Sequence, residues 1–196
     1  MTTTALLTEL EAINIILQAA DEAPVSSLYL SGLYPLERAK GILSETSRVV
    51  QSLGWKFNTE DDFPLTRDSF GTITVPVNCA RFDSDEYTDV DPVQRGQRMY
   101  DLMGHTYTWQ RDIKGTAVFM LEWDELPQPA RHYIAIRAAM TMQARSTVSE
   151  ATYRYTAEDE AAARIALQDH ETEVGDYNML RDSWSVASVL RDRGMW

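Results

Sequence analysis

The chain has 196 residues, 44% of them hydrophobic, so it can bury the core of one domain or of two small, closely packed ones. Its formal net charge of −12 argues against a sequence-reading nucleic-acid binder, because phosphate contacts require a basic surface. The single cysteine, Cys79, excludes an internal disulfide, and no apolar run is long enough for a membrane segment.

Two amphipathic helices are predicted at the start of the chain. Apolar residues recur at three- and four-residue steps from Thr4 to Asp21, with Thr4 as the N-cap and Pro24 preventing continuation. A second helix is predicted from Pro35, followed by Gly54 in the left-handed conformation that glycine adopts at low cost. The apolar side of this second helix is expected to comprise Leu36, Ala39, Ile42, Leu43, Thr46, Val50 and Leu53.

Residues from Trp55 to Trp123 are predicted to form strands, because apolar side chains alternate there with period two. The acidic, turn-rich stretch from Asp83 to Asp91 is expected to be a loop. Short strands at this spacing predict an antiparallel meander. The alternating segments are Trp55 to Phe57, Thr72 to Val77, Arg98 to Tyr100, His105 to Trp109 and Gly115 to Trp123.

The stretch from Gly115 to Ala144 is expected to join this β region to a central helix. The turn from Asp124 to Pro127 ends the strand, and the helix that follows is apolar over most of its circumference. His132 and Gln143 mark its narrow polar edge. A helix with this pattern is expected to pack against neighbours on several sides.

A last helix is predicted from Thr156, which can cap it, to about Gly175. Its thin apolar face is expected to comprise Ala161, Ala162, Ile165 and Ala166. The C-terminal tail beyond this helix contains few residues that could cover its large apolar side chains. Two readings of the tail stay open, docking on a partner or neighbouring subunit and folding back on its own domain. The suspected interface residues in the tail are Trp184, Val189, Leu190 and Trp196.

Together these elements predict an α+β fold. The N- and C-terminal helices are expected to form a bundle from residues 1–54 and 124–180, with residues 55–123 as an inserted antiparallel β region. Residues 181–196 are expected to be a C-terminal tail and are the candidate docking segment.

No catalytic, cofactor or metal site is recognised in the sequence. Asp83 and Asp85 match two ligand positions of a calcium-binding EF-hand loop, but Tyr87 and Thr88 stand where a third ligand and the turn glycine belong. The three histidines have no metal-binding spacing. Cys79 lacks the context of a nucleophile and is expected to be a small buried hydrophobe.

The adjacent acids Asp124 and Glu125 allow two interpretations. A glycosidase needs two carboxyl groups about 5–10 Å apart across a cleft, and these acids could supply one of them. Acids just before a proline-led helix have a simpler role, since they stabilise its positive N-terminal end. We favour the structural interpretation.

Several segments, taken in order, resemble the tail tubular protein A family of short-tailed phages. The likeness begins with Ala12 to Leu17 and Pro24 to Leu28, and it continues through Val50 to Asn58. It also includes the strand–turn–helix around Trp123 and the end of the last helix. The family-motif residues are Gly54, Trp55, Phe57, Asp124, Glu125, Leu126, Pro127, Tyr177, Asn178, Met179 and Leu180.

This resemblance implies a non-enzymatic virion protein, an adaptor of twelve copies in a ring between the portal protein and the nozzle, tail tubular protein B. It also implies assembly in the host cytoplasm and a lumen through which the genome leaves. With a net charge of −12 per chain, such a ring is expected to let DNA pass without sequence-specific binding. The alternative from another class is a tail-associated glycan hydrolase that acts on cell-envelope sugars. A small DNA-binding regulator is disfavoured by the charge.

Overall fold

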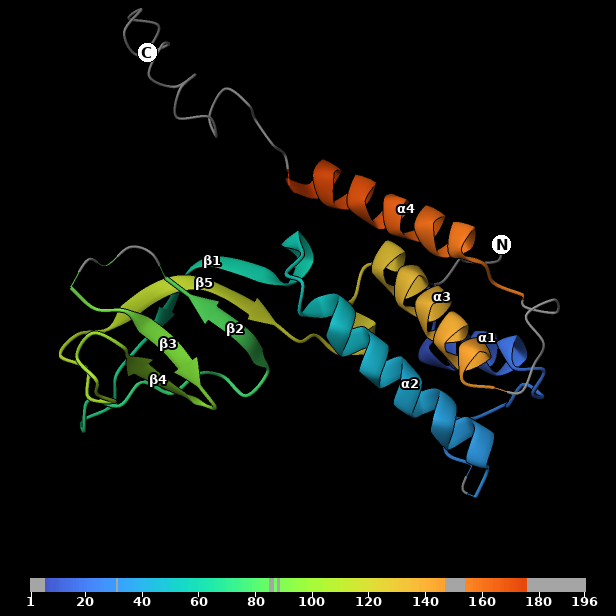
Figure 1. Ribbon diagram of the computed structural model, residues 1–196, viewed down its shortest axis with the longest axis horizontal. Coiled ribbons are helices and arrows are strands. Elements are labelled where there is room, and N and C mark those ends of the chain that lie inside the picture. The colour runs from blue at the N-terminus through green and yellow to red at the C-terminus, as the bar shows by residue number, and fades with distance from the viewer. Residues whose placement is uncertain (1–5, 31, 85–86, 88, 147–153, 176–196) are drawn as a thin grey trace, which may run out of the picture.

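The structure is a computed structural model that describes residues 6–30, 32–84, 87, 89–146 and 154–175. The helices are α1 (Glu9–Ala19), α2 (Tyr34–Gln51), α3 (Gln128–Ala144) and α4 (Ala157–Gly175). The strands are β1 (Thr59–Leu65), β2 (Cys79–Asp83), β3 (Pro92–Arg95), β4 (Arg98–Asp101) and β5 (Ile113–Phe119). The helices gather at one end of the molecule and the strands at the other, which confirms the predicted α+β fold (Figure 1). None of the described helices is long and apolar enough to cross a membrane.

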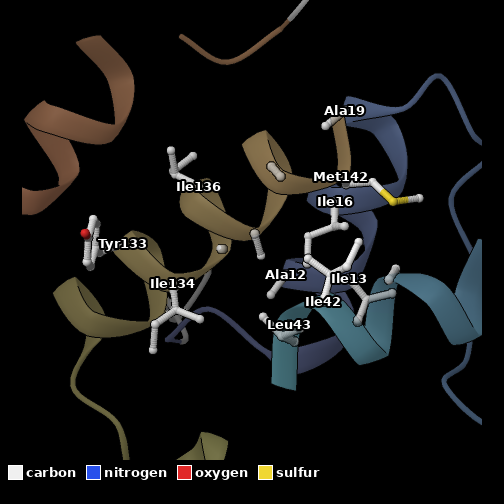
Figure 2. Close-up of a cluster of buried hydrophobic side chains, with 14 of the residues drawn as sticks. Ala12, Ile13, Ile16, Ala19, Ile42, Leu43, Tyr133, Ile134, Ile136 and Met142 are labelled. Carbon is white, nitrogen blue, oxygen red and sulfur yellow. The ribbon is translucent and has the colours of Figure 1, made fainter. Parts of the chain in front are cut away.

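Helix α3 is the centre of the helical core, as its pattern predicted. It packs against α1, α2 and α4, and Pro127 and Pro129 occupy its N-cap and first turn. Figure 2 shows Ile134 of α3 in one cluster with Ile16 of α1 and Ile42 of α2. Three helices therefore bury their apolar faces against the same central element, which removes this surface from water.

Gln143 of α3 is buried, so its expected place on a polar edge was wrong. Its Nε2 donates to the carbonyl oxygen of Tyr155 at 2.9 Å. Its Oε1 accepts from the backbone amides of Arg154 and Tyr155 at 3.0 and 3.1 Å. A buried amide is tolerated where its hydrogen bonds are made, and this one fixes the chain just before α4. His132, the other predicted edge residue, is exposed.

Helix α1 begins at Glu9 and not near Thr4, because a stronger cap lies at Thr8. The Thr8 hydroxyl accepts from the Glu11 amide at 3.2 Å, and Glu11 Oε2 accepts from the Thr8 amide at 2.8 Å. This capping box satisfies two backbone donors reciprocally. The hydrogen bonds lower the pKa of Glu11, so the stabilisation from the box is lost as the pH falls through that lowered pKa.

Helix α2 matches its prediction closely. Of its expected apolar side chains, all are buried except Leu53, which is 54% exposed beyond the helix end. Pro35 lies in the first turn, and Gly54 has a φ of +77°, in the left-handed region that favours glycine. Gly54 lies two residues after the C-cap Ser52.

Helix α4 follows its predicted bounds, but the predicted apolar face was wrong. The side chains that it buries are Ala163 and Leu167, whereas Ile165 is 56% exposed. Alanines occupy several sides of this helix, so the periodicity does not select one face, and the position of α3 does. Thr156 caps the helix as expected, and its hydrogen bonds to Asp159 lower the pKa of that carboxyl.

The strands are antiparallel, but they do not form a meander. The order in the larger sheet is β1-β5-β2, so β5 pairs with two strands that precede it by many residues. Strands β3 and β4 form a separate hairpin. Thr72 to Val77 and His105 to Trp109 contribute only isolated bridges, in which Thr74 pairs with Arg98 and Thr106 pairs with Asp101 at the two ends of β4.

The strands enclose a second, smaller core. Cys79 lies in it as a buried hydrophobe, and burial raises the pKa of its thiol. Trp109 is also buried there, with its Nε1 donating to the carbonyl oxygen of Met99 at 3.1 Å. Leu121 packs against both the helical core and this second core. The two cores therefore meet where the chain passes from β5 to α3.

Candidate functional site: the joint between helices and strands

The chain passes between the helices and the strands twice. The first crossing runs from the end of α2 through the short 3-10 helix η1 (Lys56–Asn58) into β1. The second runs from the end of β5 through the 3-10 helix η2 (Trp123–Glu125) into α3. We call these two crossings the joint. All the family-motif residues that the structure describes lie on it.

The first crossing is a tight turn and not the strand that was predicted from Trp55 to Phe57. The Trp55 amide donates to Asn58 Oδ1 at 2.8 Å, and its indole Nε1 donates to the Val50 carbonyl oxygen at 2.7 Å. Both Trp55 and Phe57 pack against the helical core. Two aromatic residues at positions i and i+2 resemble the alternation of a strand, but the segment is too short to distinguish a period of two from the three residues per turn of a 3-10 helix.

Gly54 is required here for space as well as for conformation. A Cβ at this position would lie 3.1 Å from Arg81 Nη2 and 3.2 Å from Val118 Cγ2. The end of α2 therefore lies close to side chains of β2 and β5, and a Cβ at residue 54 would require those side chains to shift by a few tenths of an ångström.

Two buried amide side chains tie the crossings together. Gln51 Nε2 donates to the Leu121 carbonyl oxygen at 3.1 Å, and the Leu121 amide donates to Gln51 Oε1 at 2.7 Å. Asn58 Nδ2 donates to the carbonyl oxygens of Gln51 and Phe119 at 2.9 and 2.7 Å. Buried, fully paired amides of this kind fix one geometry, since breaking them leaves polar groups without water.

In the second crossing, Asp124 and Glu125 do not have the predicted role of stabilising the N-terminal end of α3. Glu125 Oε2 accepts from the Glu122 amide at 3.0 Å and closes η2, while the Asp124 side chain is 94% exposed. Neither lies in the first turn of α3, which holds no acidic residue. Leu126 is buried in the helical core, and Pro127 forms the N-cap of α3. These residues therefore shape the turn and start the helix by packing and proline geometry.

Arg131 of α3 is the main residue at the joint that the sequence reasoning missed. It is buried, and its guanidinium donates to the carbonyl oxygens of Leu126, Asp124 and Leu7 at 2.8, 2.7 and 3.0 Å. The Trp123 indole donates to the same Leu7 oxygen at 3.0 Å. The segment before α1 is thereby fixed to η2. The available signal was that Arg131 is one of two arginines in a mostly apolar helix.

The geometry does not support a glycosidase pair. Asp83, where the acidic loop begins, pairs with Thr116 in the middle of β5, and Asp89 of the same loop contacts Arg111 before the start of β5, whereas Asp124 and Glu125 follow its other end. The two sets of acids thus lie toward opposite ends of one strand, which does not form a shared cleft. Within the described part of the chain, no group of three or more His, Cys, Asp or Glu side chains could hold a metal ion.

The remaining predicted residues lie outside the described residues. These are the end of the family motif and the suspected interface of the tail, namely Tyr177, Asn178, Met179, Leu180, Trp184, Val189, Leu190 and Trp196.

Comparison with known proteins gives the same family as the motifs. A family model described as tail tubular protein matches residues 10–177, which include α2, α3, α4, both crossings and all of α1 except Glu9. Tail tubular protein A of Klebsiella phage KP34 is 28% identical over 169 residues, which cover 83% of this chain and 86% of that protein. The chain therefore belongs to the tail tubular protein family and is a structural protein of the phage tail.

Proposed function

We propose that this protein is the adaptor that joins the phage portal to the tail nozzle, as a ring of twelve copies that forms part of the genome-ejection channel. The observation that carries the proposal is the family match over residues 10–177, because it covers the helices, the strands and the joint together. The proposed partners are the portal protein, tail tubular protein B and other copies of this chain. The protein acts without catalysis and assembles in the host cytoplasm.

The joint supports a mechanical function of this kind. We propose that residues 1–54 and 124–180 form the bundle, that 55–123 form the β insert, and that Gln51 and Asn58 hold the two in one orientation. An adaptor must present two different surfaces at a fixed spacing, one to each neighbour in the tail. Two cores connected by paired, buried amides meet that requirement better than a flexible linker does.

We propose that the tail, residues 181–196, docks on the portal or on the adjoining subunit through Trp184, Val189, Leu190 and Trp196. Deleting these residues is expected to leave the thermal unfolding midpoint unchanged and to abolish co-sedimentation with portal rings, because large apolar anchors dominate such contacts. The double variant Trp184→Ala, Trp196→Ala is expected to weaken the same co-sedimentation. Unchanged binding by the deletion variant would refute the docking role, and a lowered midpoint would show that the tail packs on its own domain.

We further propose that DNA passes the ring without being retained. Each chain has a net charge of −12, so the ring presents an acidic surface that repels phosphate. Purified rings are expected not to shift a duplex DNA fragment in a gel at moderate salt. Retention that falls steeply as the salt concentration rises would contradict this, since that dependence reports displaced counterions.

A further inference from the structure

The two long sides of the molecule differ in charge. Helix α3 lies between α4 and α2, while β1 and the β3–β4 hairpin lie at opposite sides of the strand region (Figure 1). One side thus presents α4 and β1, and the other presents α2 and the hairpin. Helix α4 alone holds six acidic residues and one arginine, whereas α2 has three basic residues and two acidic ones.

The hairpin carries an ordered pair of arginines. Arg95 and Arg98 are exposed and face each other across the end of the hairpin. The Arg95 guanidinium carbon lies 3.7 Å from the centroid of the Tyr100 ring, and that of Arg98 lies 4.5 Å from the Tyr107 ring. The two rings contact edge to face, with centroids 4.8 Å apart. We call these four residues the arginine hairpin.

Within the described residues, no carboxylate forms an ion pair with Arg95 or Arg98. Stacking on a tyrosine holds each guanidinium flat but leaves N–H donors at its edge, where a carboxylate binds bidentately. Arginine and tyrosine are also the residue types that dominate protein–protein interfaces. In so acidic a chain, an unpaired and preorganised pair of arginines indicates a binding surface for carboxylates.

The opposite side of the same molecule supplies such carboxylates. Glu60, Asp61 and Asp62 are consecutive and exposed on the edge strand β1, next to a break in its register with β5. Asp61 and Asp62 contact Lys56 and Lys114 at 3.5 and 3.3 Å, but their side chains remain 64% and 82% exposed. We call these three residues, together with α4, the acidic flank.

We propose that the arginine hairpin of one copy binds the acidic flank of the next copy. This inference rests on the proposed ring and identifies the contact that closes it. The two surfaces are different and lie on opposite sides, so their pairing is heterologous, and repeated heterologous contacts generate a ring where the rotation between neighbours closes. A nucleic acid fits the hairpin less well. One face of each tyrosine ring is already covered by a guanidinium, and the two rings contact each other edge to face, which restricts the stacking of a base.

A charge exchange tests the contact. The first variant carries Arg95→Glu and Arg98→Glu, and the second carries Glu60→Lys and Asp61→Lys; all four residues are exposed. Each variant alone is expected to lose assembly by about tenfold or more, because like charges then face each other. An equal mixture is expected to regain it, since each altered surface meets the complementary altered surface on its neighbour. Assembly is measured by sedimentation, alone and on portal rings of the same phage.

The outcomes separate this contact from the adaptor function. Full assembly by either variant alone, or an equal mixture that does not recover, overturns the proposed contact. Wild-type rings that form but do not bind portal refute the adaptor function and leave the charge exchange a valid test of the interface. The variant Arg95→Lys, Arg98→Lys keeps the positive charge but loses the planar guanidinium that binds a carboxylate bidentately. Its extent of assembly is expected to lie between those of the wild type and the glutamate variant. A shift of duplex DNA abolished only by Arg95→Glu, Arg98→Glu would instead assign the hairpin to nucleic acid.

Discussion

Replacing Ile134 by Ala is expected to destabilise the protein by about 3–5 kcal/mol, within the range measured for large apolar side chains truncated in a core. Ile134 is fully buried in α3, the helix against which α1, α2 and α4 all pack. Three surrounding helices cannot all move inward, so the substitution leaves a cavity as well as losing buried apolar surface. The free energy of unfolding is measured by urea denaturation.

Ile165→Ala provides the matched control for this substitution. Ile165 is the same residue type in a helix, but it is 56% exposed on α4. Its replacement is expected to change the free energy of unfolding by no more than about 0.5 kcal/mol, as for most surface positions. Similar losses at Ile134 and Ile165 would show that α3 is not the centre of the core.

Replacing Arg131 by Met is expected to cost on the order of 3 kcal/mol, because the buried carbonyl oxygen of Leu126 and the partly buried ones of Leu7 and Asp124 lose a charged donor. Methionine is close to the arginine stem in length and stays apolar, so the loss reports the hydrogen bonds more than the packing. The segment around Leu7 also loses its attachment to η2. Limited proteolysis before α1 is therefore expected to become faster than in the wild type.

Arg137→Met, six residues further along α3, is the control for Arg131→Met. Arg137 is partly exposed and contacts Glu160 at 3.8 Å and the Tyr133 hydroxyl at 2.9 Å. Exposed ion pairs contribute little, so this substitution is expected to cost less than about 1 kcal/mol. An equal loss for the two variants would contradict the role of Arg131 in the joint.

The sequence predicts best the elements whose signals are local and agree with each other. In α2, Pro35, the periodic apolar side and Gly54 all point to the same bounds, and the structure has them. In α4, alanines on several sides leave the choice of face to tertiary packing. The place of β5 between β1 and β2 has no local signature, because Thr59 pairs with Val118, far along the chain.

The residues of the joint likewise include some that the sequence predicted and some that it did not. The family resemblance selected Gly54, Trp55 and the turn before α3, and these lie together at the joint. Gln51 and Arg131 were missed, because their partners are backbone carbonyls and amides. Such groups are present at every residue, so only the folded chain shows which of them a buried side chain reaches.

The measurement that tests the adaptor function most directly is the mass of the portal complex, by native mass spectrometry, with and without this protein. We expect the portal ring to gain one discrete increment that corresponds to a complete ring of twelve copies. A portal mass that stays unchanged at saturating concentrations of the intact protein would contradict the proposed function.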